Sequence, residues 1–430
     1  MKILFVNASL KGHVHPTLEM AEVLIRRGHE VSYFTGEDFR EAIQELGGTF
    51  VPFSDKLSAF YSGYRPSDRH PFFLLTEFML SWDEAMLPEV IELCRREKFD
   101  LLICDSVFGG AFFLRQILEV PVVVSHSTFA MRRAPVPDRM LEPGFHPQLD
   151  ASIAIMERIA STYDIAACSI QELFVSKGDL NLVYTGRDFG GMPEPSGKSE
   201  SESVSPVATG SAANATLESV ARPVDAYLFV GPSLRLRTTE SDFKFPEDGR
   251  PIVFLSMGSI GLSDPAFFRT CIEALRGTRF HGILAVGHKI PVESLGELPE
   301  NISAAQYVPQ LKILSRSAVF VTHAGFNSTH EAILIGVPML ALPFANDQFI
   351  VAKRITELGL GETMDLKAVT AEDLRAAIIR LDGDEAMRGR IRDMAEMMRS
   401  GPTREDAAVA MERLVESHRN AAAGIEQLVR

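Results

Sequence analysis

Residues 322–332 read THAGFNSTHEA, and they place five polar or small side chains at the junction of two apolar segments. The run AVFVT at 318–322 precedes this junction and predicts a buried β-strand, whereas the residues after it predict a helix. A strand that passes into a helix through a short turn is typical of a β-α unit in a parallel sheet. The five side chains are those of His323, Gly325, Asn327, Ser328 and Glu331.

Two interpretations account for these polar residues. Ser328 and Glu331 have the spacing of a capping box, in which each side chain satisfies a backbone N–H at the start of a helix. A capping box does not require Gly325 or His323. A glycine-containing turn at a helix N-terminus is also a typical anion site, because backbone N–H groups and the helix dipole face outward there.

The loop after the next predicted strand also carries polar side chains. Asn346, Asp347 and Gln348 follow the apolar run MLALPF at 339–344. The carboxyl ends of parallel strands share one edge of a sheet, and open α/β sheets bind ligands at that edge. An anion site beside side chains that recognise hydroxyl groups predicts a ligand with both phosphate and sugar.

Length and composition limit the class of protein. A chain of 430 residues with 46% hydrophobic and 23% charged residues predicts a globular protein of two domains. The net charge of −14 argues against nucleic acid or an anionic membrane as the main partner. The four cysteines are scattered, no signal-peptide pattern opens the chain, and no apolar run reaches about 18 residues. We expect a cytoplasmic location without a membrane span.

The order of apolar and amphipathic segments predicts an α/β fold with two domains. Short strands alternate with helices in the first half, and a second such series begins at RPIVFLSMGS. We therefore predict an N-terminal domain over 1–235, a C-terminal domain over 248–402 and a helical tail over 403–430. Residues 192–224 are rich in Ser, Ala, Pro and Gly, which predicts a flexible insertion in the first domain.

Residues 307–348 resemble a known ligand-binding signature. The strings VPQ, THAGFNSTHEA, GVPM and DQ, in this order and spacing, are similar to the donor-binding signature of the family 1 UDP-dependent glycosyltransferases. Within that family they most resemble the bacterial macrolide and flavonoid glycosyltransferases. The resemblance implies the GT-B fold, with two Rossmann-like parallel-sheet domains facing across a cleft. It also implies a UDP-sugar donor in the second domain and an acceptor in the first.

The resemblance assigns donor contacts to individual residues. It places His323 on the diphosphate, and Glu331 on the ribose hydroxyls. Tyr307 stands where the family usually has a tryptophan that stacks on uracil. Ser259 would meet the phosphate from the other side, although a simple turn serine explains it equally well. The full donor-binding set is Ser259, Tyr307, Val308, Gln310, His323, Gly325, Asn327, Ser328, Glu331, Asp347 and Gln348.

A histidine and an aspartate form the candidate catalytic pair. His13 follows the first predicted strand, and Asp105 ends the predicted strand FDLLICD. If both strands lie in one parallel sheet, the two side chains can meet, and a histidine held by a carboxylate acts as a general base. The GHV.P pattern resembles the catalytic loop of the family, and His13 matches its base. His15 stands where asparagine is usual, and Pro16 fits the first position of a helix.

The mechanism implied by the resemblance is a direct displacement. His13 would take the proton of an acceptor hydroxyl, which attacks the anomeric carbon as UDP leaves, so that the sugar configuration inverts. The DQ pair favours glucose as the sugar. No metal or other cofactor is required, because the helix N-terminus and His323 stabilise the leaving diphosphate. The acidic string DGDE at 382–385 is read as a polar break between helices.

The acceptor pocket is expected in the first domain. Aromatic residues are dense over 57–82, and the apolar residues Phe108, Phe129 and Met131 follow strands that reach the same sheet edge. Since ligand pockets are mostly apolar, they fit a small lipophilic acceptor such as a macrolide, flavonoid or sterol. Each of these side chains could instead belong to the hydrophobic core.

Two alternative functions remain open at this point. A metal-dependent amidohydrolase would use the HVH string with His126, His281 and His323 as further ligands. A nucleotide-sugar-binding protein without catalysis would need only the donor signature. No GxGxxG motif follows the first strand of either domain, which argues against a dinucleotide oxidoreductase. The sequence does not predict the oligomeric state.

Overall fold

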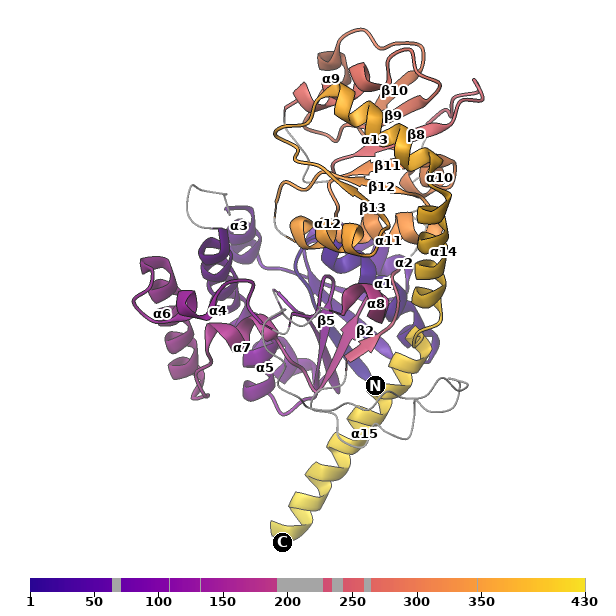
Figure 1. The fold of residues 1–430 in the computed structure, drawn as a ribbon. Coiled ribbons are helices and arrows are strands. Elements are labelled where there is room, and N and C mark those ends of the chain that lie inside the picture. The colour runs from indigo at the N-terminus through magenta and orange to yellow at the C-terminus, as the bar shows by residue number, and fades with distance from the viewer. Residues whose placement is uncertain are drawn as a thin grey trace, which may run out of the picture. The chain divides into compact units, whose positions relative to one another are not determined.

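The chain forms two compact units, each built on its own parallel sheet (Figure 1). Unit 1 comprises 1–184, 190–231 and 402–430, and unit 2 comprises 185–189 and 232–401. The computed structural model describes residues 1–63, 71–107, 109–131, 133–191, 227–233, 243–258, 264–345 and 347–429. The predicted insertion at 192–224 and the residues Phe108, Ser259 and Asn346 lie outside the described residues.

Unit 1 contains a sheet of seven described strands in the order β3-β2-β1-β4-β5-β6-β7. Every neighbouring pair is parallel. The strands are β1 (Lys2–Val6), β2 (Glu30–Thr35), β3 (Thr49–Pro52), β4 (Leu101–Asp105), β5 (Val122–His126), β6 (Leu180–Val183) and β7 (Tyr227–Phe229).

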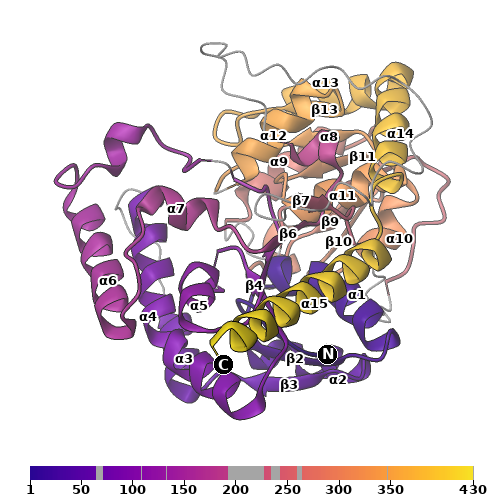
Figure 2. The ribbon, with the colours of Figure 1, turned by 90° about the horizontal axis from the view of Figure 1, so that it is seen from below.

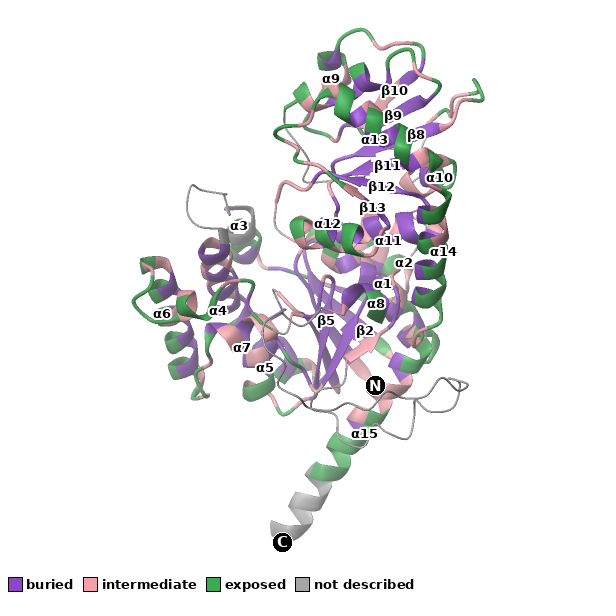
Figure 3. Cartoon of the chain, viewed as in Figure 1, coloured by how far each residue is buried: buried purple, intermediate pink, exposed green. Residues whose placement is uncertain are grey.

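The central strands of unit 1 are mostly apolar because helices cover both faces of the sheet (Figure 3). In β1, Ile3 and Phe5 belong to one buried cluster, whereas Leu4 and Val6 belong to the other. The alternation follows from the two-residue period of a strand. The helices of unit 1 are α1 (Lys11–Arg26), α2 (Arg40–Glu45), α3 (Asp55–Gly63), α4 (Pro71–Glu97), α5 (Ala111–Ile117), α6 (Pro147–Tyr163), α7 (Ile170–Val175) and α15 (Arg404–Val429).

Helix α15 packs on unit 1, where it lies alongside α1 (Figure 2). Ala407, Ala408 and Met411 are fully buried in the same cluster as Ile3. The Glu412 carboxylate accepts a hydrogen bond from Nη2 of Arg27 at 2.7 Å. The C-terminal tail is therefore part of the core of unit 1.

Unit 2 contains six described strands in the order β10-β9-β8-β11-β12-β13, all parallel. The strands are β8 (Ile252–Ser256), β9 (His281–Ala285), β10 (Ile302–Ala305), β11 (Ser317–Thr322), β12 (Met339–Ala341) and β13 (Gly361–Thr363). The helices are α9 (Ala266–Leu275), α10 (Gln310–Leu314), α11 (Phe326–Ile335), α12 (Gln348–Glu357), α13 (Ala371–Gly383) and α14 (Glu385–Arg399). The short helix α8 (Arg187–Gly190) falls largely in the 185–189 segment, which joins unit 2 although it follows β6 of unit 1.

The predicted fold class is confirmed: both units are α/β with a parallel sheet. One local prediction is wrong, since α1 begins at Lys11 and Pro16 lies inside it rather than at its first position. His13 and His15 are thus helical. The DGDE string does separate two helices, and the Asp384 carboxylate caps α14 by accepting from Met387 N at 2.8 Å. Across the described residues, no helix is long and apolar enough to cross a bilayer.

The packing of α15 leads to a stability prediction. Met411→Ala removes a fully buried side chain from the core of unit 1 and should lower the free energy of unfolding by about 2–5 kcal/mol. Urea unfolding followed by circular dichroism measures the loss. Glu416→Ala, at an exposed position of the same helix, is the matched control and should change stability by less than about 0.5 kcal/mol. Equal effects of the two substitutions would show that α15 does not support the core.

Candidate active site

His13 and Asp105 meet at the carboxyl edge of the unit 1 sheet. Strands β1 and β4 are parallel neighbours with Val6 opposite Cys104, so the segments after them begin side by side. His13 lies in the first turn of α1, and its Nδ1 is 2.7 Å from Oδ2 of Asp105. The Asp105 side chain is fully buried, whereas 19% of the His13 side chain is exposed. The structure therefore confirms that the two predicted side chains are brought together.

The surroundings of Asp105 fix the orientation of the imidazole. Val107 N donates to Oδ1 of Asp105 at 2.8 Å, so Oδ2 is directed to His13. An ionised carboxylate only accepts hydrogen bonds, so Nδ1 of His13 carries the proton in this pair. In the neutral ring Nε2 is then the basic nitrogen, which is the tautomer that a general base requires.

Two further polar residues contact His13, and the sequence analysis missed both. Ser127, directly after β5, places its Oγ 3.1 Å from Nδ1 of His13. Asn7, directly after β1, donates from Nδ2 to the backbone carbonyl of His13 at 3.3 Å. Both follow a strand of the same sheet at its carboxyl edge, and that position is the signal that could have identified them.

A second buried carboxyl group lies near this pair. Asp83 of α4 is 2% exposed, and its Oδ1 has no hydrogen-bond partner among the described residues. Burial, together with the negative charge of Asp105, raises the pKa of Asp83 well above its usual value. Asp83 therefore holds its proton more tightly than an ordinary carboxyl group.

The structure locates two of the three predicted acceptor residues. Phe129 is buried, with 2% of its surface exposed, and Met131 is half-buried. His15 packs edge-on against Phe39, with ring centroids 5.8 Å apart. Phe129 thus has the burial of a core residue.

The turn after β11 in unit 2 packs His323 between two glycines. A Cβ atom at Gly258 or at Gly325 would overlap the His323 ring, so neither position can carry a larger residue without moving the histidine. Nδ1 of His323 is buried without a hydrogen-bond partner in the part of the chain that the structure describes. Burial lowers the pKa of His323 to about 4, so the ring is neutral near pH 7.

The capping-box interpretation of Ser328 and Glu331 is wrong. Gly325 has extended backbone angles and is the N-cap of α11, which has no side-chain cap. Ser328 and Glu331 therefore lie one turn apart inside the helix. Nε2 of Gln310 donates to Oγ of Ser328 at 3.0 Å and to the Glu331 carboxylate. The structure brings these three predicted residues together and leaves the N-terminus of α11 without a side-chain cap, as an anion site needs.

The loop before α12 is organised by Gln348. Its Oε1 accepts from Phe344 N at 2.9 Å and from Ala345 N at 3.0 Å. Asp347 is the N-cap residue of α12 and is half-buried. Since the amide oxygen of Gln348 holds the loop, the side chain would contact a ligand through its NH₂ group.

The remaining predicted donor residues follow β10. Tyr307 is 62% exposed, and Val308 is half-buried. The segments after β10, β11 and β12 all lie at the carboxyl edge of one parallel sheet. Tyr307, His323 and Asp347 therefore share this edge, as expected from the sequence. Asn327, in the first turn of α11, is half-buried.

A buried histidine anchors α11 from within unit 2. His330 donates from Nδ1 to the Phe326 carbonyl at 2.6 Å, and its Nε2 lies 2.6 Å from Oγ1 of Thr185. A carbonyl only accepts, so Nε2 of the neutral ring accepts the Thr185 hydroxyl hydrogen. Phe189 is fully buried beside this histidine, with ring centroids 4.9 Å apart. The segment 185–189 thus supports the helix whose N-terminus forms the candidate anion site.

The histidines that the amidohydrolase alternative requires do not form a metal site among the described residues. His281 begins β9 and binds Asp248 at 2.7 Å, so it lies at the amino edge of the unit 2 sheet. His323 follows the carboxyl end of β11 in the same sheet, and His126 ends β5 in unit 1. Among the described residues no three His, Cys, Asp or Glu side chains are grouped as a metal site.

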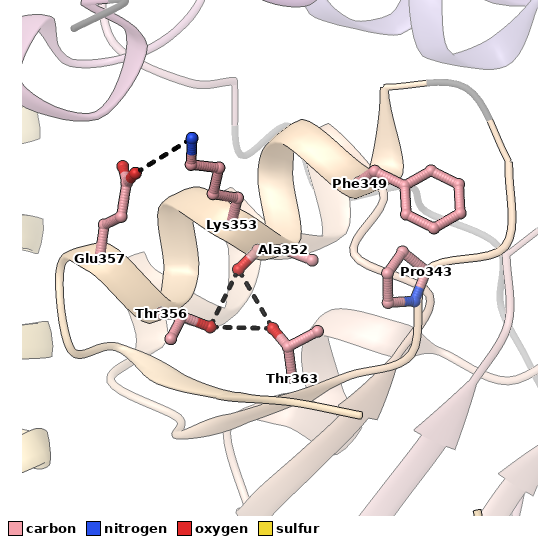
Figure 4. A pocket seen from close by; sticks show the side chains of 7 residues that line it. All are labelled: Pro343, Phe349, Ala352, Lys353, Thr356, Glu357 and Thr363. Atoms are coloured by element: carbon pink, nitrogen blue, oxygen red, sulfur yellow. Dashed lines mark hydrogen bonds and ion pairs between the residues drawn. The ribbon is translucent and has the colours of Figure 1, made fainter. Parts of the chain in front are cut away.

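A hollow of about 360 Å³ lies on α12 of unit 2. Figure 4 shows the side chains that line it. Oγ1 of Thr356 and Oγ1 of Thr363 lie 2.9 Å apart, and each lies 3.2 Å from the Ala352 carbonyl, so the two hydroxyls share this acceptor and each other. Lys353 pairs with Glu357 at 3.7 Å. The polar groups of the hollow are thus already paired, and the hollow contains none of the predicted site residues. Its lining is completed by Pro343 and Phe349.

The buried His330 predicts a pH-dependent stability. Burial lowers its pKa from 6.5 to about 4, so the unfolded chain binds this proton first as the pH falls, and the folded state loses stability between pH 6.5 and about 4. At pH 5 this cost is about 2 kcal/mol. His330→Gln should therefore be less destabilising at pH 5 than at pH 7.5 by about that amount in urea unfolding. The same difference at both pH values would contradict a neutral buried histidine.

Comparison with known proteins gives matches to glycosyltransferase-related families in both halves of the chain. Residues 282–414 match the family model for the C-terminal domain of erythromycin biosynthesis protein CIII-like proteins, and residues 12–165 match the Glycosyltransferase Family 4 model. NDP-glycosyltransferase YjiC of Bacillus subtilis is 29% identical, over 95% of this chain and 96% of the relative. Oleandomycin glycosyltransferase of Streptomyces antibioticus is 27% identical, over 94% of this chain and 89% of the relative.

Solved structures of glycosyltransferases are also similar to this chain in fold. The glycosyltransferase of kitacinnamycin matches with a TM-score of 0.79 and 26% identity, over 96% of this chain and 98% of that chain. The calicheamicin glycosyltransferase CalG4 matches in fold, with a TM-score of 0.74 and 24% identity, over 96% of this chain and 97% of that chain. These likenesses confirm the resemblance of residues 307–348 to the family 1 glycosyltransferases, and the chain is a glycosyltransferase with the two-domain GT-B fold.

Proposed function

We propose that this protein transfers glucose from UDP-glucose to a hydroxyl group of a small lipophilic acceptor, with inversion at the anomeric carbon. The observation that carries the proposal is the 2.7 Å hydrogen bond between Nδ1 of His13 and the fully buried Asp105. A glycosyltransferase that acts by direct displacement needs a base for the acceptor proton, and this pair has the geometry of one.

In the proposed reaction His13 takes the acceptor proton on Nε2. The hydroxyl oxygen forms a bond to the anomeric carbon while the bond from that carbon to the UDP oxygen breaks. The proton stays on the imidazole, and the electron pair leaves with UDP. Asp105 stabilises the imidazolium that forms, because its buried carboxylate already accepts from Nδ1.

The donor is proposed to bind at the carboxyl edge of the unit 2 sheet. The N-terminus of α11 and the neutral His323 would hold the diphosphate by donating hydrogen bonds, without a metal. Glu331 is positioned by Gln310 to accept from the ribose hydroxyls. Asp347 and the NH₂ group of Gln348 would bind the sugar hydroxyls. Tyr307 presents an exposed ring for the uracil.

The acceptor class is proposed from the relatives. One similar protein is named a demethyllactenocin mycarosyltransferase, from Streptomyces fradiae, and another a sterol 3-beta-glucosyltransferase, from Arabidopsis thaliana. Macrolides, flavonoids and sterols are all flat or ring-containing lipophiles with hydroxyl groups. Met131 stays a predicted contact for such a molecule, as does Phe129 if the pocket opens to it. The cytoplasmic location also stays a prediction.

The catalytic pair is tested by substitution. His13→Ala should lower kcat by about a hundred- to ten-thousandfold, because the acceptor hydroxyl loses its base. The affinity for UDP, measured by isothermal titration calorimetry, should stay within about twofold of wild type, since His13 belongs to unit 1 and the proposed donor residues to unit 2. Comparable turnover in this variant would remove His13 from the mechanism.

Activity itself is tested with UDP-glucose and a panel of macrolides, flavonoids and sterols. Mass spectrometry should detect an acceptor heavier by one hexose, and NMR should show a β-linkage from the α-linked donor. Transfer should persist in EDTA, whereas inhibition reversed by added metal would contradict a metal-free reaction. UDP binding without UDP release on any acceptor would favour the alternative of a binding protein without catalysis.

A further inference from the structure

Tyr307 is unusual among the described large hydrophobic side chains because 62% of it is exposed. It follows β10 at the edge of the sheet where the donor is proposed to bind. Its hydroxyl lies 3.3 Å from Nδ1 of His288, an exposed residue in the loop after β9. The catalytic chemistry proposed above gives this histidine no role.

The backbone brings these two side chains together. Beyond the paired ends of β9 and β10, Val286 N donates to the Ala305 carbonyl at 3.0 Å, and Gly287 N donates to the Gln306 carbonyl at 3.1 Å. Gly287 has a φ of +75°, a conformation that glycine adopts readily, and His288 follows it. These main-chain bonds therefore hold the two loops side by side beyond the ends of the strands, which places His288 next to Tyr307.

The contact restricts an aromatic ring that would otherwise rotate in solvent. Ordering an exposed side chain on binding costs part of the binding free energy, and a ring that is held beforehand avoids this cost. The six-membered ring of tyrosine offers less area than an indole, so its stacking depends more strongly on being correctly oriented. A hydrogen bond at the hydroxyl holds the far end of the ring, where it limits the swing of the side chain about χ1.

We propose that His288 is a positioning residue that holds the Tyr307 ring as the stacking platform for the base of the nucleoside diphosphate donor. This inference rests on the proposed function, because it assumes that the donor base stacks on Tyr307. It adds a residue that acts on donor affinity and takes no part in proton transfer.

The test is a double-mutant cycle on UDP binding, measured by isothermal titration calorimetry with wild type, His288→Ala, Tyr307→Ala and the double variant. His288→Ala should weaken UDP binding about three- to tenfold, as expected for the loss of one ordered side chain. Tyr307→Ala should weaken it about tenfold or more, as expected for the loss of base stacking. The double variant should bind UDP no more weakly than Tyr307→Ala, because His288 acts only through the ring.

Three controls separate positioning from a general structural effect. Tyr307→Phe keeps the ring but loses the hydroxyl, so it should match His288→Ala. His288→Gln keeps a group that can hydrogen bond to the hydroxyl and should retain most of the affinity. Inorganic pyrophosphate has no base, so wild type and His288→Ala should bind it equally. In turnover, His288→Ala should raise KM for the donor while kcat changes less than about twofold.

The outcomes distinguish this inference from the proposed function. A wild-type protein that does not bind UDP would overturn the proposed function, and this inference with it. If wild type binds UDP and His288→Ala binds it equally well, only the role of His288 is overturned. The same holds if the His288→Ala penalty persists in the Tyr307→Ala background or extends to pyrophosphate.

Discussion

The chemistry proposed for this protein depends on one hydrogen bond, between Nδ1 of His13 and the buried carboxylate of Asp105. It exists because β1 and β4 are adjacent parallel strands, so that the segments following them start at one edge of the sheet. The bond determines the tautomer of the imidazole and so leaves Nε2 as the base. Burial and the charge of Asp105 raise the pKa of the neighbouring Asp83 well above its usual value, which disfavours a second negative charge beside Asp105.

In unit 2 the backbone supplies much of the proposed diphosphate-binding surface. Gly258 and Gly325 allow the His323 ring to pack against the main chain, and Gly325 begins α11 without a side-chain cap. In the proposed complex the first turn of the helix would present its N–H groups to the diphosphate of the donor. The buried pair of His330 and Thr185 supports this helix on its interior side. Preorganised dipoles of this kind need no reorganisation when charge develops on a leaving group.

Several features of the fold and site could be predicted because they depend on local order along the chain. The strand at 318–322 and the polar turn after it could be predicted because an apolar run ends there at a glycine-containing loop. Edge strands such as β3, β10 and β13 were missed because they are short and half-buried, which weakens the apolar signal. The capping-box prediction was wrong because a serine and a glutamate three residues apart can occur inside a helix as well as at its start, and Ser328 and Glu331 lie inside α11.

The two α/β series, the donor signature and the candidate base could be identified from the amino-acid sequence, since each depends on residues close together in the chain. The contacts between distant segments became known from the three-dimensional structure: Ser127 beside His13, Thr185 beside α11, and His288 beside Tyr307. It also decided that the C-terminal helix completes the core of unit 1. The physical reason is that sheet order and register, which no local pattern specifies, decide which strand ends become neighbours.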